Sequence, residues 1–117
     1  MTFFLCKTCG TQYPPSDRPP PACPICEDPR QYIPHDEGQV WLAWEDVLEG
    51  HEAEIRDDNG ILGIGCTPSL AIGQRALLVK SSAGNVLWDC IPYLDEEITK
   101  RVGAEGGLAA IAISHPH

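Results

Sequence analysis

The sequence predicts a small cysteine-rich ribbon followed by an incomplete α/β segment with a mixed sheet. Four of the six cysteines form two Cys-x-x-Cys pairs within residues 6–26, a spacing typical of a metal site that holds together a segment too small for a core of its own. Residues 61–113 then show strand-like and helix-like apolar patterns in turn, as α/β domains do. We therefore divide the 117 residues into a four-cysteine module (1–35), an acidic linking segment (36–60) and an α/β segment (61–117).

The first cysteine pair lies in Cys6-Lys7-Thr8-Cys9-Gly10 and the second in Cys23-Pro24-Ile25-Cys26. A tetrahedral ion takes soft ligands at about 2.3 Å, and two such turns can supply four thiolates. The predicted ligands are Cys6, Cys9, Cys23 and Cys26. Zinc is the metal we expect, although the same cage can hold iron. Four reduced cysteines without a metal, or two disulfides, are the alternatives.

The remaining cysteines, Cys66 and Cys90, lie far downstream in apolar surroundings, where we expect buried thiols. The apolar start, Met1 to Leu5, lacks the basic leader of a secretory signal, and no apolar run approaches the ~20 residues that span a membrane. These features predict a cytoplasmic protein without a membrane partner, whose paired cysteines stay reduced and bind metal.

The linking segment holds most of the net charge of −9, since residues 36–60 contain nine acids and one base. Such a block opposes binding to a phosphate backbone, so we predict no nucleic-acid partner. Val40, Leu42 and Trp44 alternate as in a short strand, and residues 57–60 (Asp-Asp-Asn-Gly) read as a turn.

The α/β segment begins with three candidate strands at 61–66, 74–80 and 86–91. The loop Ser81-Ser82-Ala83-Gly84-Asn85 separates the second from the third and suits a β-hairpin. These strands provide the mixed sheet of the predicted fold.

A helix follows, with Asp95 as its N-cap and acids in its first turn. Leu94, Ile98 and Val102 are spaced by four and predict one buried face, and glycines 103, 106 and 107 end the helix. The apolar run 108–113 predicts a strand covered on both faces.

His115 and His117 flank Pro116 directly after that strand. Alternate side chains of an extended segment point to the same side, so both imidazoles can face one ion. The local alternative is a pair of solvent-exposed histidines at the chain end. These residues alone leave both interpretations open.

Two family resemblances extend this interpretation. Residues 3–30 resemble the zinc-ribbon and rubredoxin-like families, although Glu27 stands where rubredoxins usually have glycine. Residues 70–117 resemble the opening of the metallo-β-lactamase fold, in which a strand ends in Asp, a helix follows, and a buried strand leads into a His-x-His-x-Asp-His metal motif. Asp89, the helix from Asp95 and the pair His115 and His117 match those features in order.

The resemblance implies the N-terminal portion of a metal-dependent hydrolase with an αββα layering, in which His115 and His117 form a partial metal site. The sequence stops at His117, before the Asp-His half of the motif, and a catalytic zinc needs about three protein ligands. We therefore expect this chain to be inactive by itself, with a small-molecule substrate only in a complete domain. The other open readings are a non-catalytic binding module and an iron-loaded electron carrier. An incomplete sheet would also expose an edge prone to self-association.

Overall fold

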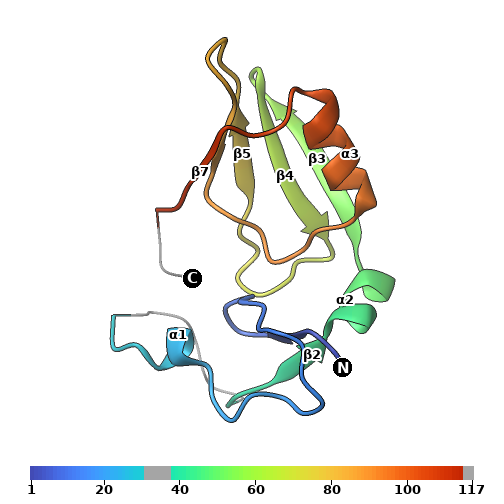
Figure 1. Cartoon of the computed structure of the whole chain (residues 1–117), viewed down its shortest axis with the longest axis vertical. Coiled ribbons are helices and arrows are strands. Elements are labelled where there is room, and N and C mark those ends of the chain that lie inside the picture. Colours follow the sequence, from blue (N-terminus) through green and yellow to red (C-terminus); the bar gives the residue numbers. More distant parts are fainter. Residues whose placement is uncertain (31–37, 115–117) are drawn as a thin grey trace.

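Two β-sheets of different size organise the computed structural model, which describes residues 1–30 and 38–114 (Figure 1). The strands are β1 (Phe4–Cys6), β2 (Trp41–Ala43), β3 (Glu52–Asp58), β4 (Ile61–Thr67), β5 (Ala76–Val79), β6 (Val86–Trp88) and β7 (Ala110–Ala112). The helices are α1 (Pro24–Glu27), α2 (Trp44–Gly50) and α3 (Glu96–Ala104).

The smaller sheet pairs β1 with β2 in antiparallel fashion, and Cys6 lies opposite Trp41. The strand predicted around residues 40–44 is thus present but ends at Ala43, because α2 begins at Trp44. This pairing makes the start of the linking segment part of the cysteine ribbon.

The larger sheet has the order β3-β4-β5-β6-β7. Its first four strands are antiparallel and the last pair, β6 and β7, is parallel, so the predicted mixed sheet is confirmed. The predicted hairpin joins β5 to β6, and the predicted turn joins β3 to β4, where the Gly60 N–H donates to Asp57 Oδ1 at 2.7 Å.

Strand β3 was not predicted, because acids outnumber apolar residues along it. Ala53 and Ile55 pack against the core, as alternate residues of a half-buried strand do, while Glu52, Asp57 and Asp58 are exposed and Glu54 is half-buried. The described part of residues 36–60 is therefore not a plain linker: β2 belongs to the ribbon and β3 to the larger sheet.

One hydrophobic core joins the two sheets. Its buried members are Leu5, Val47, Leu62, Ile64, Leu70, Leu78, Tyr93 and Ile98. They come from β1, α2, β4, β5, two loops and α3, so the ribbon and the larger sheet share this core.

The glycines that loosen β4 have a packing role on the other face of the sheet. A Cβ at Gly63 would lie 2.2 Å from a guanidinium nitrogen of Arg75, and one at Gly65 would lie 3.0 Å from Arg75 Cγ. Arg75 thus lies flat across the strand and donates to Asp58 Oδ2 at 3.1 Å. This half of the second face is polar and charged.

Helix α3 begins as predicted, because the N–H of Ile98 donates to Asp95 Oδ1 at 2.9 Å. Ile98 is buried and Val102 packs against the core, but the prediction for Leu94 was wrong. Leu94 precedes the N-cap, so it does not lie on the helical face and is exposed. With nine residues, α3 is the longest described helix, and none of the described helices is long and apolar enough to cross a membrane.

Replacing Asp95 by Ala should lower the free energy of unfolding by about 1 kcal/mol, the usual cost of losing an N-cap. The carboxylate also accepts a hydrogen bond from Tyr93 Oη at 2.8 Å. The loss of stability should therefore be at least about 1 kcal/mol. Asp95→Asn keeps an acceptor for the Ile98 N–H and serves as the control. Urea unfolding measures both variants, and equal stability of Asp95→Ala and the parent chain would contradict the capping role.

The prediction that residues 108–113 form a strand covered on both faces was wrong. The strand is β7, which lies at the edge of the sheet, and Leu108, Ile111 and Ile113 are exposed. Helix α3 lies against β3, at the opposite edge of the sheet, and does not cover β7 (Figure 1). In the described residues, the larger sheet is mixed and five-stranded and is accompanied by few helices. The αββα layering implied by the resemblance is not confirmed.

Candidate metal centre

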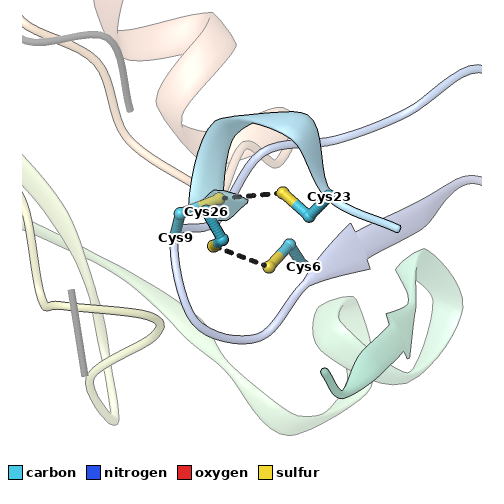
Figure 2. A group of neighbouring side chains, drawn as sticks. All are labelled: Cys6, Cys9, Cys23 and Cys26. Carbon is cyan, nitrogen blue, oxygen red and sulfur yellow. Dashed lines mark hydrogen bonds between the residues drawn. The ribbon is translucent and has the colours of Figure 1, made fainter. Parts of the chain in front are cut away.

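The fold brings the two cysteine pairs together. Cys6 ends β1 and Cys9 lies in the turn that follows, whereas Cys23 directly precedes the short helix α1 and Cys26 lies within it. The sulfur atoms of all four lie within 4.8 Å of one another and point to a common centre (Figure 2). Cys6, Cys9 and Cys23 are buried and Cys26 is half-buried, so the predicted grouping of four cysteines is confirmed.

The sulfur separations match a tetrahedral metal site. Cys6 Sγ lies 3.6 Å from Cys26 Sγ, and Cys9 Sγ lies 3.7 Å from Cys23 Sγ. Four sulfurs at about 2.3 Å from a central ion would be about 3.8 Å apart. A disulfide needs about 2.05 Å, and none of the six cysteines forms one. The cluster can therefore accept a metal ion.

Backbone geometry around the first pair explains Gly10. Its φ of +82° favours glycine, and its N–H donates to the Cys6 carbonyl at 2.8 Å, closing the turn. A Cβ at this position would also lie only 2.5 Å from Pro92 Cβ. Gly10 is therefore required both by the turn that contains Cys6 and Cys9 and by the close contact of the ribbon with the loop after β6.

Three side chains outside the cysteine pairs contact the sulfurs. Gln39 Nε2 donates to Cys6 Sγ at 3.3 Å, and Tyr13 Oη donates to Cys23 Sγ at 3.0 Å. The Cys9 thiol donates to Thr11 Oγ1 at 3.1 Å, and on ionisation of this thiol the hydroxyl can donate in return. The sequence analysis did not identify these residues. Thr11 and Tyr13 could have been suggested by their position, because they are polar residues just after the first cysteine pair. Nothing in the sequence near Gln39 indicates its contact with Cys6.

The thiols differ in how readily they ionise. Burial opposes ionisation of Cys6, but hydrogen bonds from Gln39 and from the backbone of Cys9 and Thr8 outweigh it and lower its pKa to about 7. Burial raises the pKa of Cys9 to about 11, and burial with the neighbouring cysteines raises that of Cys26. The raised pKa values of Cys9 and Cys26 favour their protonated forms, so binding of a metal to these thiols would release protons.

Contacts with the rest of the chain fix the cluster. Gln74, from the loop before β5, donates through Nε2 to the Cys9 carbonyl at 3.1 Å. Tyr13 packs edge-on against Trp41 with ring centroids 5.3 Å apart, and both rings lie against the cysteines. The site is therefore held from both sheets.

The second predicted metal site lies outside the described residues, since neither His115 nor His117 is among them. The structure does describe the residues before it. Asp89, which follows β6, accepts hydrogen bonds through Oδ1 from the Ser114 N–H at 2.8 Å and from Ser114 Oγ at 2.5 Å. Asp89 therefore fixes the residue that directly precedes His115.

Cys66 and Cys90 do not belong to the four-cysteine cluster. Cys66 and Cys90 are half-buried rather than fully buried, because each lies near the end of a strand at the margin of the core. Burial, together with Glu54 for Cys66 and Asp89 for Cys90, raises the pKa of both thiols. Raised pKa values favour the unreactive thiol form at neutral pH.

Comparison with known proteins gives one informative similarity. The chain is 43% identical over 120 residues to the uncharacterized protein YmaE of Bacillus subtilis (strain 168), a match that covers the whole chain and 43% of that relative. The chain thus spans less than half the length of this relative. No family model matches the sequence, and no solved structure matches the fold.

Proposed function

We propose that Cys6, Cys9, Cys23 and Cys26 bind one zinc ion in a structural site. The observation that carries this proposal is the grouping of four free sulfurs at separations close to those of a tetrahedral thiolate cage. A closed set of four protein ligands leaves no position for substrate or water, which is typical of structural zinc.

Because residues 3–30 resemble rubredoxins, iron is the alternative metal for this site. We favour zinc because the second cysteine pair departs from the rubredoxin pattern at Glu27. This residue ends α1, and its N–H donates to the Cys23 carbonyl at 3.0 Å as part of a helical turn. The first pair instead closes with the left-handed Gly10. An electron carrier is the alternative if iron is the resident metal.

Elemental analysis of the purified chain tests the proposal. We expect one zinc per chain, lost in the double variant Cys6→Ser/Cys23→Ser. Cys66→Ser removes a cysteine outside the cluster and should keep the zinc. Iron at the same ratio, with the red colour of thiolate-to-iron charge transfer, would replace the structural role by electron transfer. A chain without bound metal would contradict both roles.

We further propose that this chain corresponds to the N-terminal portion of a metal-dependent hydrolase of the metallo-β-lactamase superfamily. The proposal rests on the sequence resemblance, and the hydrogen bonds from Ser114 to Asp89 support it, since they orient the chain just before His115. His115 and His117 would provide two of the about three protein ligands that a hydrolytic zinc needs. Turnover by this chain alone is therefore not expected.

Titration of the zinc-loaded chain with further zinc tests this second proposal. The imidazole NMR signals of His115 and His117 should shift together at a second, weaker binding step, and Asp89→Ala should weaken that step. His51, whose Nδ1 lies 3.0 Å from the Val47 carbonyl, provides an internal reference signal. Histidine signals at 115 and 117 that stay unchanged at millimolar zinc would contradict the hydrolase-type site.

A further inference from the structure

The end of the larger sheet formed by β6 and β7 carries exposed apolar side chains on both faces. Register places Ile111 beside Leu87 on the face that bears the core, and Trp88 beside Leu77 on the opposite face. Ile111 is 57% exposed and Trp88 is 47% exposed. Large apolar side chains gathered in this way usually mark an interface.

The main chain of β7 is also available for pairing with another strand. The sheet order ends at β7, which pairs only with β6 among the described strands. Parallel strands are normally buried on both faces, and free sheet edges are normally protected by charge, by proline or by a covering element. Residues 106–114 contain no charged residue and no proline, so this edge has none of the sequence devices that discourage strand pairing.

The opposite edge of the sheet is protected. Strand β3 carries four acids, Glu52, Glu54, Asp57 and Asp58, with a single base, Arg56. Two β3 edges would repel each other, and a β7 edge against a β3 edge would place apolar side chains against solvated carboxylates. A β7 edge is therefore complementary to another β7 edge and to no other described edge of this sheet.

We propose that a second copy of this chain covers the β7 edge, by antiparallel pairing of β7 with β7 of the other copy about a two-fold axis. Pairing like edges closes the assembly at two copies, whereas β7 on β3 would build an open filament.

Sedimentation equilibrium of the purified full chain, across about a hundredfold range of concentration, tests this proposal. We expect a concentration-dependent mass that approaches twice 12.8 kDa. Ile111→Lys should weaken dimerisation at least about tenfold, because it places a charge at the centre of the contact. Ile61→Lys replaces an isoleucine that is 40% exposed at the first residue of β4, distant from β7, and should change the dissociation constant less than about twofold.

Trp88→Gln provides a second variant on the other face of the sheet and should also weaken the dimer. Zinc content and circular dichroism of each variant confirm that it is folded. A chain that stays monomeric throughout, a dimer that neither variant weakens, or open-ended assembly would each overturn the proposal. If the chain is a monomer, the β7 edge is left for a different occupant, such as a further segment of polypeptide like the one that makes the relative longer.

Discussion

Removing the metal from the four-cysteine site should unfold the ribbon, residues 1–30 with β2, and should destabilise the larger sheet to a smaller extent, because the ribbon supplies Leu5 to the shared core. Three of the four cysteines are buried at the centre of the ribbon, and their packing partners there are Tyr13, Ile25, Cys26 and Trp41. A cluster this small does not offset the chain entropy of the segment without the metal. Structural zinc contributes about 10–16 kcal/mol to the folding of isolated finger peptides, which sets the scale of the loss.

Amide hydrogen exchange before and after chelation measures this effect. Amides of β1 and β2 should lose protection on addition of a strong chelator or in Cys6→Ser/Cys23→Ser, whereas the paired amides of β3, β4 and β5 should lose less of theirs. Cys66→Ser under the same conditions shows whether loss of any cysteine has this effect. Ribbon amides that remain protected without metal would contradict a structural role for the ion, even if the ion binds.

Local chemistry made the cysteine cluster predictable from the sequence. The two Cys-x-x-Cys pairs each fix their own turn, and Gly10 closes the first one with a positive φ. The N-cap at Asp95 was predictable for the same reason, because its hydrogen bond reaches only to Ile98. In these places the residues that determine the structure are a few positions apart.

Features that depend on distant parts of the chain were missed or wrong. Gln39 reaches a sulfur 33 residues before it, and no pattern near Gln39 indicates that contact. The apolar run around Ile111 reads as a covered strand, yet its burial depends on which strands α3 covers. Strand β3 escaped prediction because pairing with β4 outweighs its poor intrinsic strand propensity. Composition describes a side chain, whereas burial depends on the neighbours that the topology supplies.

Strand β1 links the four-cysteine cluster to the rest of the molecule. Leu5 and Cys6 are consecutive, so their side chains point to opposite sides of the strand. Leu5, which is 1% exposed, packs in the main core with residues such as Leu62 and Val47, while Cys6 faces the other three cysteines. One strand therefore couples folding of the ribbon to packing of the larger sheet.

Leu5→Ala should therefore destabilise the whole chain by about 2–5 kcal/mol, the range for truncating a fully buried leucine. Zinc should remain at one per chain, because the side chain that changes is on the far side of the strand from the sulfurs. Phe3→Ala is the matched control: Phe3 lies just before β1 and is 40% exposed, so its truncation should cost well under half as much. Urea unfolding, followed by far-ultraviolet circular dichroism with zinc present, measures both variants. If Leu5→Ala lowered the stability of the ribbon amides alone and left the exchange of β4 and β5 unchanged, the ribbon would be an independent unit, and Leu5 would not couple it to the sheet.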